Sequence, residues 1–237
     1  MKLNDIVLQQ GDCLELMKKI PDGSIDLIVT DPPYKLVSGG CVGKRSMANT
    51  GIFKSNSDAV RKGKLFNHNE ITFAEWIPEA FRVLKEKAHC YIMINGRNLA
   101  ALQNECEKAG FIYQNLLVWN KGNVTPSKWY MNQCEFILML RKGKAKNINV
   151  MGTSTLLDAP NIIGEKCHPT EKPVALMQKL VINSSKYDET VLDPFMGSGS
   201  AGIACLNTSR KFIGMELDEQ YFEIAKERIE EARKRLK

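Results

Sequence analysis

Near the end of the chain, ten residues have the composition of a ligand-binding turn. Val191 and Leu192 are apolar and typical of a strand, and the segment 193–200, Asp-Pro-Phe-Met-Gly-Ser-Gly-Ser, follows them. Gly197 and Gly199 allow the backbone to turn tightly, so a ligand can approach the main-chain N–H groups at the start of the following helix. We expect this turn to hold a cofactor.

A carboxylate lies at the end of the next expected strand. Glu216 can accept hydrogen bonds from both hydroxyls of a ribose. Residues 197–202 also match GxGxxG, so an NAD-dependent oxidoreductase is an open alternative. Two features argue against an NAD-dependent enzyme. Only 21 residues follow Glu216, too few for the usual second half-domain, and Asp193 and Phe195 stand where they could contact a charged tail and a base.

A second motif, Asp31-Pro32-Pro33-Tyr34, follows the apolar run 25–30. Its prolines fix φ and remove two N–H donors, so the flanking carbonyls and the Asp31 carboxylate form a set of acceptors. Such a set suits an exocyclic NH2 group, because accepting both hydrogens draws the nitrogen toward tetrahedral geometry and presents its lone pair to a methyl donor. Tyr34 can stack on the planar base. We expect the two motifs to meet in one pocket at the carboxyl edge of a sheet.

Other nucleophiles and metal ligands are scattered. None of the seven cysteines follows a proline, so the thiolate route to carbon-5 of cytosine lacks a candidate nucleophile. The three histidines are not spaced as ligands, and we expect no metal. Cysteines without CxxC pairs are typical of a reducing compartment, which predicts a cytoplasmic protein. Residues 1–5 lack the apolar stretch of a signal peptide, and no apolar run reaches the roughly 20 residues of a membrane span.

The positive charge concentrates in one segment. Residues 35–64 contain seven basic residues and one acid, Asp58, and therefore hold the whole net charge of +6. Their Gly, Ser and Asn content predicts a flexible insertion at about 35–70, either merely solvated or in contact with a polyanion. The basic residues that we expect to contact the phosphates of such a polyanion are Lys35, Lys44, Arg45, Lys54, Arg61, Lys62, Lys64, Arg141, Lys142 and Lys144.

Apolar periodicity predicts the elements that carry these motifs. Strands are expected at 6–10, 25–30, 89–94, 112–119, 135–140, 190–192 and 211–215. Helices are expected at 13–20, capped by Asp12 with Glu15 as capping-box partner, and at 73–84, 99–110, 173–181, 198–206 and 218–235. Pro78 could instead mark the start of the regular part of the second helix.

This alternation predicts an α/β protein with a doubly wound, mainly parallel seven-stranded sheet. The strands at 112–119 and 135–140 leave no room for a crossover helix, so we expect an antiparallel hairpin at one edge. Residues 141–167 have no strong period and are our candidate for a short target-recognition excursion. We expect residues 1–237 to form a single domain. For Trp119, Trp129 and Tyr130 we expect packing in the core or hairpin rather than stacking on bases.

Together the motifs resemble the amino-group DNA methyltransferases that use S-adenosylmethionine. The order, with residues 31–34 first and 193–199 near the end, looks like the circularly permuted beta group. Further family marks are Gly11-Asp12-Cys13, Trp119-Asn120-Lys121-Gly122 and the segment 168–173, His-Pro-Thr-Glu-Lys-Pro. The resemblance implies a Rossmann-like methyltransferase fold and site-specific methyl transfer to N6 of a flipped-out adenine in DNA.

The resemblance also implies roles for the matching residues. Asp31 and Tyr34 would hold the target base, and Pro32, followed by Pro33, would supply a carbonyl acceptor. Glu216 would bind the ribose hydroxyls, and Lys172 would approach the methionine carboxylate. Asp12 and Cys13 would meet the adenine of the cofactor, while the remaining cofactor contacts would be Asp193, Phe195, Gly197, Ser198, Gly199 and Ser200. Ser200 stands where the family usually has threonine, which keeps the hydroxyl.

Several alternatives stay open at this point. N4 of cytosine presents the same NH2 geometry, and Asp31 favours adenine by resemblance rather than by physics. A nucleic-acid-binding protein without turnover, or the NAD enzyme, is the candidate from another class. Since relatives of this kind often pair, we consider a homodimer and a cognate restriction endonuclease as partners. The stretch before His168 is shorter than in many relatives, which leaves the target sequence open.

Overall fold

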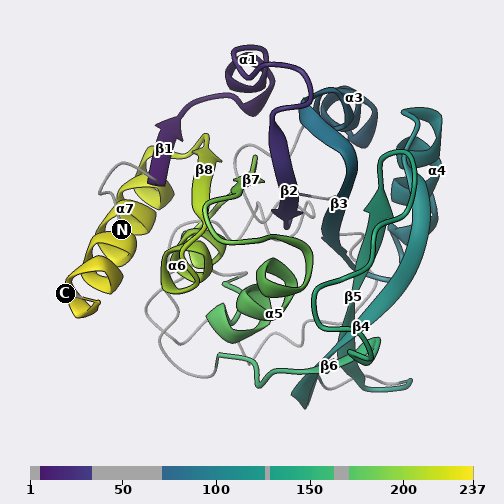
Figure 1. Ribbon diagram of the computed structural model, residues 1–237. Helices are drawn as coiled ribbons and strands as arrows, with labels where there is room; N and C mark the ends of the chain where they lie inside the picture. The colour runs from purple at the N-terminus through teal and green to yellow at the C-terminus, as the bar shows by residue number, and fades with distance from the viewer. Residues whose placement is uncertain (1–5, 34–70, 126–128, 163–170, 237) are drawn as a thin grey trace, which may run out of the picture.

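The computed structural model describes residues 6–33, 71–125, 129–162 and 171–236, and the strands in these ranges form one sheet (Figure 1). The strand order is β1-β8-β7-β2-β3-β5-β4-β6. The strands are β1 (Ile6–Gln10), β2 (Ile25–Thr30), β3 (Leu84–Ile94), β4 (Ile112–Thr125), β5 (Asn132–Arg141), β6 (Leu156–Asp158), β7 (Thr190–Asp193) and β8 (Lys211–Glu216).

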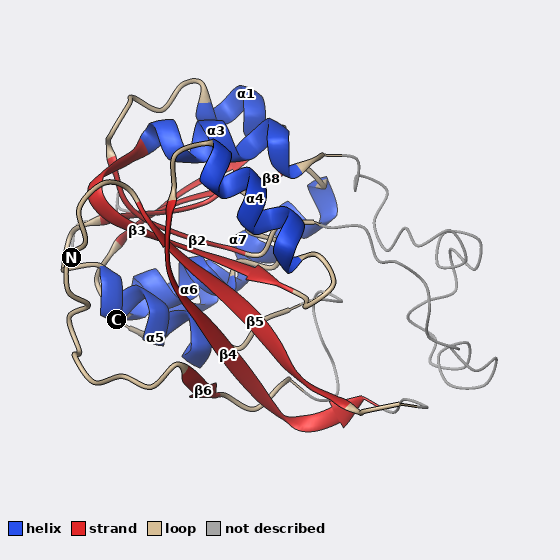
Figure 2. Ribbon diagram, turned by 90° about the vertical axis from the view of Figure 1, so that its right-hand side faces the viewer, coloured by secondary structure: helices blue, strands red, loops and turns tan. Residues whose placement is uncertain are grey.

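Six helices accompany the sheet in the described ranges. They are α1 (Cys13–Met17), α3 (Phe73–Val83), α4 (Leu99–Lys108), α5 (Val174–Ser184), α6 (Ser200–Asn207) and α7 (Glu219–Arg235). Figure 2 shows α1, α3 and α4 on one face of the sheet and α5 and α6 on the other. None of the described helices combines the length and apolarity that a membrane span requires.

The central strands are buried on both faces, as continuous apolar runs predict. Cys90 and Ile92 of β3 pack in the core beneath α1, α3 and α4, whereas Tyr91 and Met93 pack in the core on the α5 and α6 side. This alternation follows from the two-residue period of a strand. The mainly parallel α/β sheet is therefore confirmed.

The number of strands and the edge differ from the prediction. The sheet has eight strands, because the short strand β6 lies within residues 141–167 and pairs parallel to β4. The antiparallel hairpin of β4 and β5 is confirmed, but β6 and not the hairpin forms the edge. A strand of three residues leaves too little periodicity to detect, and its position depends on the neighbouring strand.

Two helix starts test the capping arguments. Asp12 caps α1, where its side chain accepts from the backbone N of Leu14 at 2.8 Å, but Glu15 pairs with Lys18 instead of completing a capping box. The capping box occurs at α3, where the Glu75 carboxylate accepts from Thr72. Because that box starts the helix at Phe73, Pro78 lies inside α3 rather than at the start of its regular part.

Candidate active site

The two motifs lie side by side at one edge of the sheet. β1, β8, β7, β2 and β3 are all parallel, so their carboxyl ends meet at this edge. β2 and β7 are direct neighbours, with Leu27 opposite Val191. The hydroxyl of Thr30 donates to Oδ1 of Asp193 at 2.7 Å and joins the two strand ends directly. This convergence is the arrangement that the sequence predicts.

The glycine turn is fixed by backbone geometry and by close packing. Gly199 caps α6 with a φ of +79°, in the left-handed region that favours glycine. A Cβ at this position would lie 3.1 Å from the Cβ of Ala225 in α7. The backbone N of Met196 donates to the carbonyl of Met215 at 2.9 Å, which holds the turn against the end of β8.

Glu216 lies against this turn at the end of β8. Its Oε2 accepts from the backbone N of Gly197 at 3.0 Å, and its Oε1 accepts from the backbone N of Asp218 at 2.9 Å. Burial raises the pKa of Glu216, while these hydrogen bonds oppose the shift. Each carboxylate oxygen accepts more than one hydrogen bond, so Glu216 is oriented and still able to receive ligand hydroxyls.

Asp12 and Cys13 follow β1 next to Glu216, because the backbone N of Gly11 donates to the Glu216 carbonyl at 2.8 Å. Burial raises the pKa of Cys13 to about 12, so the side chain is a neutral thiol at physiological pH. The carboxylate of Asp12 is engaged in capping α1. Both residues therefore lie at the same edge as the glycine turn.

A buried charge cluster surrounds Asp31. The ammonium of Lys172 lies 2.5 Å from Oδ2 of Asp31 and 3.7 Å from Oε2 of Glu135, and Lys121 lies 3.3 Å from Oε1 of Glu135. Burial raises the pKa of Asp31, and this outweighs the opposite effect of Lys172. Burial lowers the pKa of Lys172, but the carboxylates of Asp31 and Glu135 raise it by more. Lys172 is therefore a cation that contacts Asp31, the first residue of the motif at 31–34.

Asp193 points back into the protein. Besides Thr30, its Oδ1 accepts from the backbone N of Phe195 at 3.1 Å. Burial raises its pKa to about 7. The carboxyl group therefore shapes the turn, through contacts that the sequence did not reveal.

Two buried polar atoms at this edge lack a hydrogen-bond partner among the described residues. They are Oδ1 of Asp31 and the hydroxyl oxygen of Ser200. Buried polar groups are normally hydrogen-bonded, so two orphaned atoms in one region fit a polar ligand. Phe195 completes this region, with its ring edge-on to the buried Trp76 of α3 at 5.2 Å between centroids.

Arg228 of α7 connects the two halves of the site, and sequence reasoning missed it. Its guanidinium donates to the carbonyl of Ser198 at 2.6 Å and to Oε1 of Glu171, the neighbour of Lys172. Arg228 stands in a helix full of charged residues, so nothing in the sequence marks it. Glu135 was also missed, although the pairing of its strand with Trp119 places it near Lys121.

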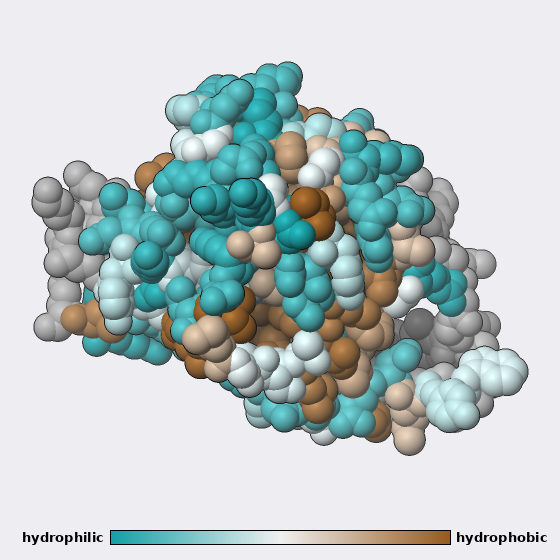
Figure 3. Space-filling model, turned by 45° about the vertical axis from the view of Figure 1, so that its right-hand side comes forward, coloured by the Kyte–Doolittle hydropathy of each residue, from teal (hydrophilic) through white to brown (hydrophobic). Residues whose placement is uncertain are grey.

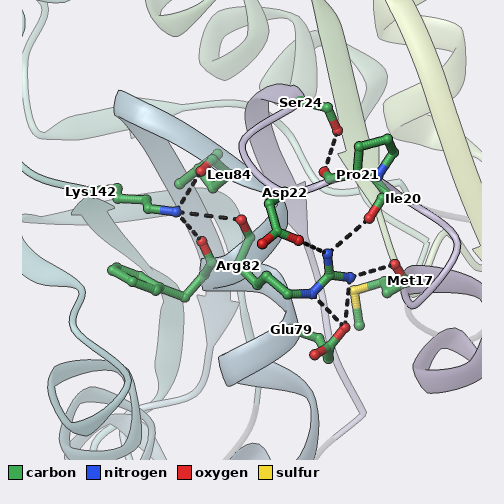
Figure 4. A network of polar contacts seen from close by, with 10 residues as sticks. Met17, Ile20, Pro21, Asp22, Ser24, Glu79, Arg82, Leu84 and Lys142 are labelled. Atoms are coloured by element: carbon green, nitrogen blue, oxygen red, sulfur yellow. Dashed lines mark hydrogen bonds and ion pairs between the residues drawn. The ribbon is translucent and has the colours of Figure 1, made fainter.

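Three basic residues lie far from this edge. β5 runs antiparallel to β3, so its last residue, Arg141, pairs with His89 in the middle of β3, on the side away from the carboxyl end of that strand. The ammonium of Lys142 donates to the carbonyls of Phe81 and Leu84 at 2.8 Å each and caps the end of α3 (Figure 4). Lys144 follows at the same amino edge. Arg141, Lys142 and Lys144 therefore do not lie beside the pocket, and their contact with DNA phosphates stays a prediction.

The other predicted DNA contacts lie outside the described residues, as does Tyr34: Lys35, Lys44, Arg45, Lys54, Arg61, Lys62 and Lys64. Of the three hairpin aromatics, Trp119 is buried as predicted and donates from Nε1 to the Ala159 carbonyl at 2.7 Å. Trp129 and Tyr130 are 89% and 96% exposed, so the expected packing in the core is not found for them. The hairpin extends beyond the core at this end.

A cavity of about 310 Å³ lies away from the motifs, between α5, the strands β4 and β5 and the loop that precedes β6. Apolar side chains, brown in Figure 3, gather around a hollow in the lower half of the face shown there. The residues that line the cavity include Leu117, Met139 and Leu180 and none of the predicted site residues.

Comparisons with known proteins agree on one family. The family described as DNA methylase (N6_N4_Mtase) matches residues 25–227. The chain is 30% identical over 247 residues to the type II methyltransferase M2.MboI of Moraxella bovis, covering 94% of this chain and 87% of that protein. It is 30% identical over 254 residues to M.HinfI of Haemophilus influenzae, covering 97% and 70%.

Solved structures agree with this likeness. The crystal structure of the M1.HpyAVI–SAM complex matches with a TM-score of 0.70 at 28% identity, covering 94% of this chain and 99% of that chain. The cytosine-N4-specific PvuII DNA methyltransferase matches with a TM-score of 0.71 at 17% identity, covering 98% and 93%. At that identity the second match shows the fold alone.

Proposed function

The chain belongs to the DNA methylase family, and from this premise we propose that it methylates N6 of adenine at a specific sequence in DNA. As a DNA methyltransferase it uses S-adenosylmethionine as methyl donor. The observation that carries transfer to an amino group is the position of Asp31 beside the glycine turn, with the Thr30–Asp193 hydrogen bond of 2.7 Å between them. The choice of adenine over cytosine rests on the resemblance of Asp31 to the family motif. A methyl acceptor and a methyl donor must meet at such a place.

The residues of the glycine turn and of the neighbouring strand ends fit the methyl donor, S-adenosylmethionine. Glu216 would accept the ribose hydroxyls, Asp12 and Cys13 would meet the adenine, and Phe195, Gly197, Ser198, Gly199 and Ser200 would line the remainder. The orphaned hydroxyl of Ser200 and the free lone pairs of the oriented Glu216 support this assignment. When bound, S-adenosylmethionine supplies an electrophilic methyl group on a sulfonium.

Asp31 would orient the methyl acceptor, which is the exocyclic NH2 group of the target base. Lys172 holds Oδ2, so Oδ1 is left to accept a hydrogen from the target NH2 group, and the Pro32 carbonyl would take the other. This orients the nitrogen lone pair by positioning rather than by covalent chemistry. A methylated amino nitrogen must lose a proton, and the raised pKa of Asp31 makes this carboxylate a suitable acceptor. Tyr34 would stack on the base.

The target base must leave the duplex to reach Asp31. Rotation of a nucleotide out of the stack costs a few kcal/mol, which contacts to the rest of the DNA must offset. The basic residues in 35–64 would contribute by contacting phosphates, and such contacts make binding salt-dependent.

Nucleoside analysis tests the proposal. Unmethylated plasmid DNA is incubated with the protein and methyl-labelled S-adenosylmethionine, digested to nucleosides and separated by chromatography. We expect label in N6-methyldeoxyadenosine. Label in N4-methyldeoxycytidine would replace adenine by cytosine and leave the amino-transfer chemistry intact. Label in 5-methyldeoxycytidine, or in no nucleoside, would overturn the mechanism.

A homodimer, a cognate restriction endonuclease and a cytoplasmic location stay predictions. The described cysteines are all free, which supports a reducing compartment. Sedimentation of the purified protein with and without DNA would measure the oligomeric state.

A further inference from the structure

The β4–β5 hairpin extends past the rest of the sheet on the side of the candidate active site. The last residue of β3, Ile94, pairs with Phe136 of β5, and the hairpin continues beyond this point to the pair Thr125 and Asn132. Figure 2 shows β4 and β5 as a long ribbon that projects from the helices and the other strands. The extension therefore begins where the carboxyl ends of the parallel strands meet.

The base of this extension contacts the charge cluster around Asp31. Glu135 of β5 lies 3.7 Å from Lys172, which in turn contacts Asp31. From Glu135 to Asn132, the first residue of β5, the strand advances three residues, which is about 10 Å at 3.3 Å per residue. Residues 129–131 come directly before this strand, so the end of the hairpin lies on the same side of the sheet as the residue that would bind the target base.

This hairpin end exposes large side chains. Trp129 is 89% exposed, Tyr130 96% and Met131 57%, whereas Trp119, which pairs with Glu135 at the base of the extension, is 1% exposed. Contiguous exposed side chains of this kind mark a surface that meets a partner. The sequence between residues 122 and 134 contains no acidic residue, so nothing in it repels a polyanion.

We propose that Trp129 and Tyr130 form a DNA-contacting wedge that inserts against the base pairs beside the flipped target nucleotide. DNA is the substrate of the family, and the major groove, about 12 Å wide, admits a two-stranded β-ribbon. Aromatic rings stack on bases of any sequence, and apolar side chains of architectural proteins insert between base steps. Rings in the stack stabilise the duplex from which a base has left. This inference rests on the proposed methylation of a flipped base.

The test compares two kinds of DNA. The methylation site is first mapped in DNA treated with the wild-type protein, and duplexes are made with the target base either paired or mispaired. A mispaired base costs less to flip, so the wild type should bind the mispaired duplex more tightly. We expect Trp129→Ala/Tyr130→Ala to weaken binding to the paired duplex roughly 10-fold or more, the effect of losing a stacked ring. Binding to the mispaired duplex should weaken by a similar factor, because the rings stack beside the vacated position in both complexes.

The matched control is Tyr187→Ala, which removes a ring that is 74% exposed and lies before β7, away from the hairpin. It should bind both duplexes as the wild type does. Trp129→Phe/Tyr130→Phe should retain most of the binding, because stacking needs a ring rather than its polar atom. Titration with S-adenosylmethionine and thermal unfolding should give wild-type values for all variants.

Equal binding of both duplexes by Trp129→Ala/Tyr130→Ala and the wild type would overturn the wedge. A loss of self-association with unchanged DNA binding would also overturn it, because the occupant of the surface would then be a second copy of the chain. The proposed function fails separately, if the wild-type protein transfers no label to an amino group of DNA.

Discussion

The ammonium of Lys172 lies 2.5 Å from Oδ2 of Asp31, across 141 positions of sequence. The contact links the segment before α5 to the residue after β2 and fixes which oxygen of Asp31 remains available. Oδ1 is buried and has no partner in the described part of the chain, so the geometry presents one acceptor atom to a substrate. Several measurable consequences depend on this pair.

Replacing Lys172→Met keeps the side-chain length and leaves the Asp31 carboxylate buried without its counter-charge. Breaking a buried ion pair on one side destabilises by about 3–5 kcal/mol, so we expect a lower free energy of unfolding in urea. We also expect kcat to fall and the Kd for S-adenosylmethionine to stay near the wild-type value. A large loss of cofactor affinity with unchanged kcat would instead support the role that the family resemblance implies, contact with the methionine carboxylate.

Glu216→Gln is expected to weaken cofactor binding without affecting DNA binding. The carboxylate is oriented by the backbone N–H groups of Gly197 and Asp218, and an amide cannot accept ribose hydroxyls with a charged oxygen. A hydrogen bond to a charged group contributes about 1.5–3 kcal/mol, so the Kd should rise roughly 10- to 150-fold. Isothermal titration measures it, and the exposed Glu219→Gln is the control. Equal affinity for the two variants would exclude Glu216 from the cofactor site.

Arg228→Met is expected to raise the KM for S-adenosylmethionine more than it lowers kcat. Arg228 contacts no predicted substrate atom but holds the Ser198 carbonyl and Glu171, so its loss should loosen the glycine turn. Arg228→Lys should recover part of the affinity because it keeps one donor. The control is Arg235→Met, since the Arg235 side chain is 82% exposed at the end of α7. A kcat defect with unchanged KM would contradict a positioning role.

We expect the buried carboxyl group of Asp193 to make the free energy of unfolding depend on pH. Burial raises its pKa from 3.8 to about 7, so between these values the folded protein binds more protons than the unfolded chain. The free energy of unfolding should therefore decrease as the pH rises from 4 to 7 on account of this group. Asp193→Asn keeps an acceptor for Thr30 and removes the titration. Urea unfolding from pH 4 to 8 should show a weaker decline in the variant, and parallel profiles would exclude Asp193 as the cause.

Much of the fold was predictable because its signals are local. The apolar run of β2 gives its bounds, Ile25–Thr30, and the spacing in β4 and β5 gives an antiparallel hairpin. β6 was not predictable, because three residues show no period and pair only where β4 already lies. The full length of the hairpin was missed as well, since its polar outer part has no apolar alternation.

The candidate site likewise contains residues that the sequence predicted and residues that it did not. The two motifs were found because glycine and proline constrain the backbone, and parallel strands bring them to one edge. The partners of these motifs were not found, because Glu135 and Arg228 are ordinary charged residues whose roles depend on three-dimensional contacts. The contact of Lys142 with the end of α3 was not found either, because a charge alone does not identify its partner. Lys142 lies at the amino edge because β5 runs antiparallel to β3, a direction that the hairpin prediction left open.

The central claim is that Asp31 orients the methyl acceptor in the site built with the glycine turn. Its most direct test is a single-turnover measurement with Asp31→Asn, in which enzyme saturated with S-adenosylmethionine is mixed with DNA. We predict methyl transfer about 100-fold slower or more, the loss typical of a removed proton acceptor, with cofactor and DNA affinities near those of the wild type. Transfer at the wild-type rate would contradict the account.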